Sequence, residues 1–115
     1  MPARHNVSAR ADIAESAAVF FALGDETRLG LLARLCHEGP TSIAKLTESF
    51  DMTRQAITKH LRVMEDAGLV HRAQQGRQSI WRLEPKRVAE ARRHLESISA
   101  QWDDALLRLR RFVER

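Results

Sequence analysis

Apolar residues recur every three or four positions along most of the chain, and polar residues or glycines separate the resulting blocks. This spacing is typical of amphipathic helices. Residues that cap or end helices mark the boundaries: Asp25 precedes the second block, Thr53 precedes the fourth, and Gly68 follows it. The pattern therefore predicts helices near residues 12–23, 26–37, 42–50, 54–67 and from 86 almost to the C-terminus.

The same spacing indicates which side chains face the core. In the first helix the apolar set is Ile13, Ala17, Phe20, Phe21 and Leu23. The next three helices each present a narrower inward face. We expect these faces to consist of Leu29, Leu32 and Leu35 with Cys36, then of Ile43, Leu46 and Phe50, and finally of Ile57, Leu61 and Met64.

Between the fourth and last helices the pattern changes. Residues 69–75 and 78–83 are two short segments that contain strand-forming residues, and Gly76-Arg77 lies between them. This arrangement predicts a β-hairpin. Pro85 then suits the first turn of the last helix. The predicted fold is mainly α-helical with a small β-hairpin.

The last predicted helix is too long for the rest of the domain to cover. Its apolar positions alternate by three and four, and a helix of about 28 residues is about 42 Å long. Such a stripe needs a partner surface, most simply that of a second copy of the chain. We predict a homodimer whose interface contains Phe20, Leu95, Ile98, Trp102, Leu106, Leu109 and Val113.

The positive charge of the chain is concentrated in one segment. Residues 52–83 hold six Lys or Arg against two acids, a net +4, which is also the net charge of all 115 residues. Basic side chains placed along a line of phosphates release counterions and gain affinity. Double-stranded DNA is therefore the first candidate partner.

A short helix, a turn, a capped helix and a basic hairpin together describe a helix-turn-helix followed by a wing. No acid lies between Asp51 and Glu65. N-terminal residues of a recognition helix reach base edges in the major groove, where Gln suits adenine and Arg or Lys suits guanine. A basic hairpin tip suits the DNA backbone. The predicted DNA contacts are Thr53, Arg54, Gln55, Thr58, Lys59, Arg62, Arg77 and Gln78.

Three motifs follow one another along residues 18–84: Phe20 to Leu29 around Leu-Gly-Asp-Glu-Thr-Arg-Leu, Thr58-Lys59-His60-Leu61 through Ala67-Gly68-Leu69-Val70, and Gly76-Arg77 with Trp81-Arg82-Leu83. This succession resembles that of the ArsR-type (arsenic-repressor-like) winged-helix regulators. The resemblance implies a homodimeric repressor of transcription. It also implies pairing through the first and last helices, and release from DNA by a signal.

The resemblance does not extend to the metal sites of that family. Members that bind arsenic or cadmium carry Cys-x-Cys at the start of the third helix, where this chain has Ser42-Ile43-Ala44. Zinc-type members use Asp and His ligands in the last helix, which here offers His94, Asp103 and Asp104 without a second His. We therefore expect no metal site and no cofactor, and a signal that is an unknown small molecule or a redox change.

Other classes of protein fit the sequence less well. There is no phosphate loop or nucleophile motif, and Asp103 and Asp104 diverge by about 100° on one helix, so no enzyme is expected. No apolar run approaches the roughly 20 residues of a membrane span. Cys36, the single cysteine, is expected to be buried and inert in a reducing cytoplasm.

Residues 1–11 are interpreted as a flexible basic arm and residues 12–115 as one domain. Two alternatives stay open for its function: a winged-helix protein-interaction module, and a metal-responsive repressor of the same fold.

Overall fold

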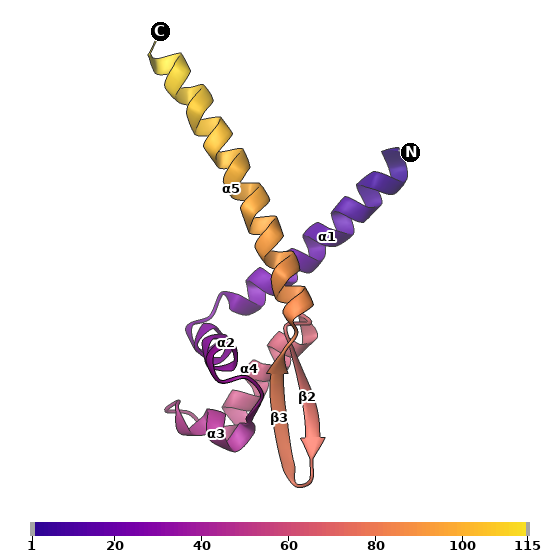
Figure 1. Ribbon diagram of the computed structural model, residues 1–115, viewed down its shortest axis with the longest axis vertical. Helices are drawn as coiled ribbons and strands as arrows, with labels where there is room; N and C mark the ends of the chain where they lie inside the picture. Colours follow the sequence, from indigo (N-terminus) through magenta and orange to yellow (C-terminus); the bar gives the residue numbers. More distant parts are fainter. Residues whose placement is uncertain (1, 115) are drawn as a thin grey trace.

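The computed structural model describes residues 2–114 of the chain, with side chains described from Ile13 onwards. Helices α2, α3 and α4 and a small sheet form a body, from which α1 and α5 project as two diverging arms (Figure 1). This is the predicted winged helix-turn-helix with a long C-terminal helix. The elements are α1 (Pro2–Leu23), α2 (Glu26–Glu38), β1 (Thr41–Ser42), α3 (Ile43–Glu48), α4 (Arg54–Asp66), β2 (Val70–Gln75), β3 (Gln78–Leu83) and α5 (Pro85–Val113).

Side-chain caps fix the starts of the central helices. Each cap oxygen accepts a hydrogen bond from a backbone N–H that has no partner within its helix. The capping residues and the amides that they accept from are Asp25 and Arg28 (3.0 Å), Ser42 and Lys45 (3.2 Å), and Thr53 and Ala56 (3.1 Å). The predicted starts of α2, α3 and α4 are confirmed.

Helix α1 begins at Pro2, ahead of the predicted start near residue 12. The prediction of a flexible basic arm falls on residues 1–11, whose side chains lie outside the described part of the chain. It stays a prediction.

The hairpin is confirmed, and it belongs to a sheet with one more strand than predicted. Strands β2 and β3 pair antiparallel around Gly76, and β1 adds to the other edge of β3 with Thr41 opposite Trp81. Strand β1 has only two residues, too few to show an alternating pattern, and Ser42 also caps α3. This strand fastens the helix-turn-helix to the wing.

The core lies between α2, α3, α4 and the sheet. Ile57, Leu61 and Met64 are completely buried, as predicted. In α2 the prediction was right for Leu35, which is buried, but wrong for Leu29, which is 51% exposed, and it missed the buried Leu31. Residues two apart on a helix point in nearly opposite directions, so the burial of Leu31 turns Leu29 outward. Cys36, expected to be buried, is also exposed.

In helix α1, as in α2, some residues that were predicted to face the core are exposed. From Ile13 onwards its buried side chains are Ser16, Val19 and Ala22, while Ile13 is 55% and Phe21 is 74% exposed. Most of the apolar positions that gave the helical spacing therefore face away from the core of this chain. Among the described helices none is long and apolar enough to cross a membrane.

Candidate nucleic-acid interface

Helix α4 is held firmly on one side and open on the other. Its inner face is packed on the core, and it contacts α2, α3 and β2. On its outer side Arg54, Gln55, Lys59 and Arg62 are all exposed. The fixed inner face determines where the outer side chains point, so a ligand meets a rigid row of donors.

The cations of this row are available to a polyanion. Within the described part of the chain, Arg54, Lys59 and Arg62 form no ion pair, although seven other Lys, Arg or His residues do so. The N-terminus of α4 adds the partial positive charge of its unpaired amides. Charge and helix dipole therefore favour an anion on the same side.

The hydroxyl groups of the two threonines of the predicted site already form hydrogen bonds within α4. The hydroxyl oxygen of Thr53 accepts from the Ala56 amide and caps α4, and the hydroxyl group of Thr58 donates to the Arg54 carbonyl oxygen at 2.8 Å. Both hydroxyl oxygens can still accept, and the side-chain amide of Gln55 forms no hydrogen bond with a described residue. The role of Gln55 as a reader of base edges stays a prediction.

The wing carries the remaining predicted contacts. Arg77 and Gln78 are exposed at the tip of the hairpin, which points away from the ends of α1 and α5 (Figure 1). The amide of Gln74 donates to the Gly76 carbonyl at 3.2 Å and holds the turn. Arg72 and Arg82, not among the predicted contacts, are also exposed and extend the basic surface along the strands.

Electrostatic contacts hold α4 to the start of α2. Nδ1 of His60 in α4 lies 3.7 Å from Oδ2 of Asp25 and 3.4 Å from Nη1 of Arg28. Arg28 also donates to the Ala22 and Phe21 carbonyl oxygens at the end of α1. The Arg28 amide, followed by the charges of Arg28 and His60, lowers the pKa of Asp25. This cluster fixes α4 relative to α1 and α2.

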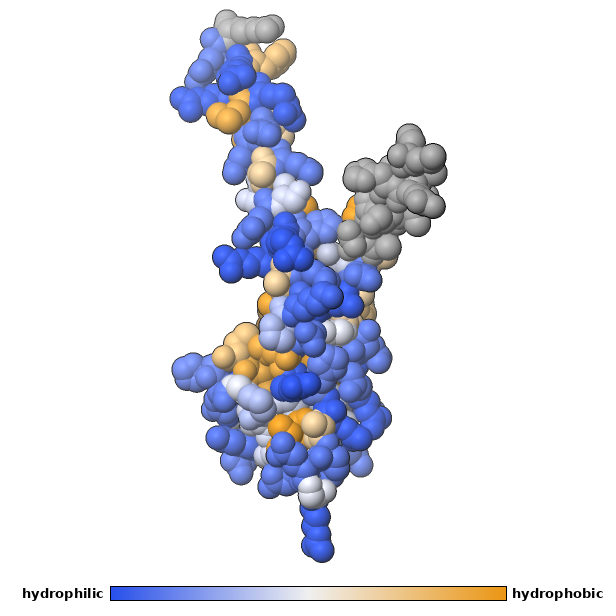
Figure 2. All heavy atoms as spheres, turned by 45° about the vertical axis from the view of Figure 1, so that its right-hand side comes forward, coloured by the Kyte–Doolittle hydropathy of each residue, from blue (hydrophilic) through white to orange (hydrophobic). Residues whose placement is uncertain are grey.

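The predicted dimer residues form an exposed stripe on α5. Exposed fractions of Leu95, Ile98, Trp102, Leu106, Leu109 and Val113 run from 37% to 74%. Figure 2 shows apolar patches interrupting the hydrophilic surface of this projecting helix. Phe20 is half-buried, with its ring edge-on to His94. Ile13, Phe21 and Phe112 are equally exposed apolar residues that the predicted interface did not include.

Within the described residues, no group of three or more His, Cys, Asp or Glu side chains is placed to hold a metal ion.

Similar proteins are transcriptional regulators. The family model of a helix-turn-helix domain matches residues 23–73. The arsenical resistance operon repressor of Bacillus subtilis is 35% identical over 69 residues, which cover 60% of this chain and 66% of that repressor. An HTH-type transcriptional regulator of Mycobacterium tuberculosis is 33% identical over 85 residues, covering 74% of this chain and 76% of that protein.

A solved structure agrees with these sequence relatives. An ArsR-like transcriptional regulator from Rhodococcus sp. RHA1 is 36% identical and superimposes with a TM-score of 0.73. The match covers 87% of this chain and 93% of that one, so it includes the body and at least part of each arm.

Proposed function

Because the chain belongs to the ArsR family of winged helix-turn-helix transcriptional regulators, which bind DNA and are not enzymes, we propose that it is a homodimeric repressor that binds an imperfect palindrome. The observation that carries this proposal is that the basic surface and the exposed apolar surface lie on different parts of the molecule. The basic row of α4 and the wing tip lie on the body, while the exposed apolar faces belong to the projecting helices. A repressor is favoured because the similar Bacillus subtilis protein represses an operon.

Two-fold pairing through α1 and α5 relates the two copies of α4 by the dimer axis. Each α4 then enters a major groove, and the two half-sites lie about 10 bp or a multiple of it apart. The operator has matching two-fold symmetry, imperfect where only the backbone is contacted.

Some of the proposed contacts are to base edges, and the others are to the sugar-phosphate backbone. Gln55 reads a base edge, with Arg54 and Lys59 as further readers near the start of α4. Arg62, Arg77 and Gln78 lie further out and contact the sugar-phosphate backbone, which fixes the register without reading sequence. Thr53 and Thr58 accept or donate only as their intrahelical bonds allow.

The test is binding of the purified protein to DNA from upstream of its own gene, against an unrelated fragment of equal length, measured by fluorescence anisotropy near physiological salt. We expect selective binding, with affinity at least 10³-fold above that for the unrelated fragment, as is typical of specific regulators. Footprinting of the bound fragment should reveal a two-fold symmetric site. Weak and equal binding to both fragments would contradict the proposal and favour the interaction-module alternative.

A further inference from the structure

In the proposed dimer, two copies of α4 reach two half-sites at once, so the distance and the angle between them matter for DNA binding. Both quantities depend on how α4 is attached to α1 and α5, the helices through which the two copies are proposed to pair. The contacts that make this attachment therefore bear on the spacing of half-sites that the protein accepts.

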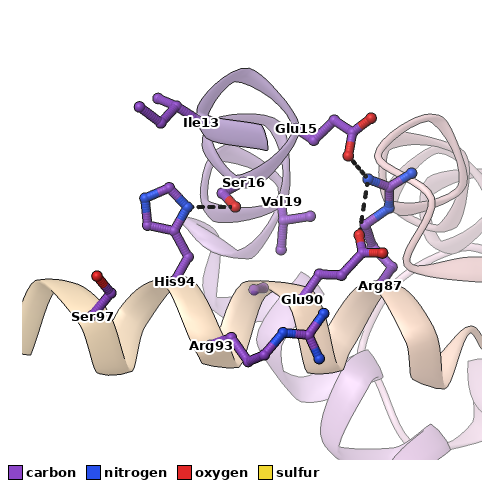
Figure 3. A pocket seen from close by; sticks show the side chains of 10 residues that line it. Ile13, Glu15, Ser16, Val19, Arg87, Glu90, Arg93, His94 and Ser97 are labelled. Carbon is purple, nitrogen blue, oxygen red and sulfur yellow. Dashed lines mark hydrogen bonds and ion pairs between the residues drawn. The ribbon is translucent and has the colours of Figure 1, made fainter. Parts of the chain in front are cut away.

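Helices α1 and α5 are tied to each other by polar contacts. Nη1 of Arg87 in α5 lies 2.7 Å from Oε2 of Glu15 in α1, and Nδ1 of His94 in α5 lies 2.9 Å from the hydroxyl oxygen of the buried Ser16. Figure 3 shows both contacts, whose side chains line a cavity of about 440 Å³ between the two helices. A contact from α4 to α1 therefore also places α4 relative to α5.

Arg28, in the first turn of α2, provides such a contact. Its guanidinium donates to the carbonyl oxygens of Ala22 and Phe21 in the last turn of α1, where a positive charge is favoured. On its other side, Nη1 of Arg28 lies 3.4 Å from Nδ1 of His60 in α4. One side chain thus joins the end of α1 to the middle of α4.

The chemistry of the two groups fixes the direction of the hydrogen bond between them. A guanidinium can only donate, so Nδ1 of His60 accepts from Arg28 and the proton of the neutral ring is on Nε2. Asp25 does not replace Arg28 as the partner, because its Oδ2 lies 3.7 Å from Nδ1, beyond hydrogen-bond distance. The His60 side chain is only 21% exposed, so water competes little for this contact.

Apolar packing holds α4 in place but restrains its orientation less. Ile57, Leu61 and Met64 are buried in the core, and α4 also lies in contact with α1. Hydrophobic contacts are non-directional, whereas a hydrogen bond weakens steeply when its donor and acceptor are misaligned. The Arg28–His60 hydrogen bond therefore opposes a rotation of α4 that apolar packing would tolerate.

We propose that Arg28 and His60 are positioning residues that fix α4 relative to the dimer helices and thereby determine which half-site spacing the protein binds, a role that rests on the proposed function. Neither residue needs to touch DNA for this role. Without their hydrogen bond, α4 keeps its outer side chains but adopts a range of orientations. Binding then loses preorganisation at the correct spacing, and incorrect spacings are penalised less.

Matched substitutions separate this hydrogen bond from the rest of the packing. His60→Leu removes the acceptor, whereas His60→Asn keeps an oxygen acceptor near the place of Nδ1. Arg28→Lys keeps the charge but loses the planar fork that reaches both helices. His37→Leu, at an exposed histidine of α2 outside this contact, is the control. Urea denaturation establishes that each variant is folded.

The first measurement uses the full-length protein without DNA. A nitroxide at Gln55→Cys, with Cys36→Ser to remove the native thiol, gives one label per protomer and one distance per dimer in double electron–electron resonance. We expect a narrow distribution near about 34 Å, the separation of successive major grooves. His60→Leu and Arg28→Lys should broaden it, whereas His60→Asn and His37→Leu should leave it narrow.

The second measurement varies the spacer between the half-sites of the operator. Each added base pair turns one half-site by about 34° around the DNA axis relative to the other. Two added base pairs should cost the unmodified protein and His60→Asn about tenfold in affinity, the scale of a hydrogen bond to a charged group. His60→Leu should lose less than about threefold on the same change, although it binds the original operator about tenfold more weakly. A defect of folding alone would lower affinity by the same factor at every spacing.

The possible failures are distinct. The positioning role is overturned if the unmodified protein already gives a broad distribution, if His60→Leu matches His37→Leu in either measurement, or if His60→Asn behaves like His60→Leu. Narrow distances that His60→Leu broadens, without selective DNA binding, would overturn the proposed repressor and keep the positioning of α4. The absence of any distance between labels would overturn the dimer, and the positioning role with it.

Discussion

At the residue scale, two glycines with positive φ differ in what an added side chain would contact. Gly76 has a φ of 59° and Gly68 a φ of 78°, values that other residues rarely adopt. A Cβ at Gly76 would meet nothing within 4 Å, whereas one at Gly68 would lie 2.8 Å from Nε of Arg87. Because Glu15 and Glu90 hold Arg87, its guanidinium has little room to retreat.

We therefore predict different costs for the same substitution at these two positions. Gly76→Ala should lower the free energy of unfolding by about 1 kcal/mol, the cost of the positive φ alone. Gly68→Ala should cost about 2 to 3 kcal/mol, because the contact with Arg87 adds to the same backbone cost. Urea denaturation of the two variants measures the difference. Equal losses would show that Arg87 moves aside freely and does not press on α4.

Two residues of the proposed DNA contact should also behave differently. Gln55→Ala should flatten the preference at one base pair by about 1 to 3 kcal/mol while leaving binding to unrelated DNA unchanged. Arg77→Ala should weaken binding to every sequence and lower the slope of log affinity against log salt by about 1. Competition assays over a salt series measure both effects, with Arg92→Ala on α5 as a control. An unchanged slope in Arg77→Ala would remove the wing tip from the contact.

At the scale of elements, α5 begins at a junction with the wing. The Glu84 carboxylate accepts from Nε2 of His71 in β2 at 2.8 Å and from the Lys86 amide at 3.3 Å. The hydrogen bond from His71, followed by that from the Lys86 amide, lowers the pKa of Glu84 below its ordinary value of 4.5. One side chain thus caps α5 and ties it to the hairpin.

This junction predicts a pH dependence of stability. A carboxyl whose pKa is lowered by folding stabilises the folded state above its ordinary pKa of 4.5, and this contribution is lost as the pH falls through the lowered value. Glu84→Gln should therefore be less stable than the unmodified protein at neutral pH, and the difference should shrink below pH 4.5. Urea denaturation between neutral and acidic pH measures it, with Glu96→Gln, which caps no helix, as the control. A difference independent of pH would rule out the charge of Glu84 as its cause.

The sequence predicted where these helices begin better than it predicted which of their faces is buried. The caps Asp25, Ser42 and Thr53 accept from amides three residues further along the chain, so the helix starts were predictable from the local sequence. The side of α2 that faces the core was not predictable, because both Leu29 and Leu31 are apolar and only packing against other elements decides between them. Strand β1 was missed because its pairing with β3 is a long-range contact.

At the scale of the whole molecule, the chain is too extended to be a compact domain by itself. Its radius of gyration is 18.5 Å, against about 13 Å for a compact domain of this size. The excess comes from α1 and α5, which leave the body in different directions (Figure 1). We propose that a second copy of the chain covers the exposed apolar faces of these two helices.

The stripe on α5 offers a matched test of the proposed dimer. Trp102→Glu and Leu109→Glu place charge within the stripe, whereas Leu107→Glu places it about 120° away on the same helix, where Leu107 is 50% exposed. We expect the first two variants to sediment as monomers at micromolar concentration and Leu107→Glu to remain a dimer. Analytical ultracentrifugation measures the state of each. A dimer that tolerates both stripe variants would exclude this face as the interface.

The sequence by itself determined the order of the elements, the caps, the basic segment and the family, because these depend on adjacent residues and on motifs at fixed spacing. It also predicted the inner face of α4, where the buried residues lie on one side, and the stripe of α5, although Leu107 is exposed on another side of that helix. Only the tertiary structure decided which side of α1 and α2 is buried, how β1 joins the wing, and where the cavity lies. The physical reason is that, when a helix has apolar residues on several sides, only packing against other elements decides which side is buried. A cavity likewise forms only where the side chains of two helices meet.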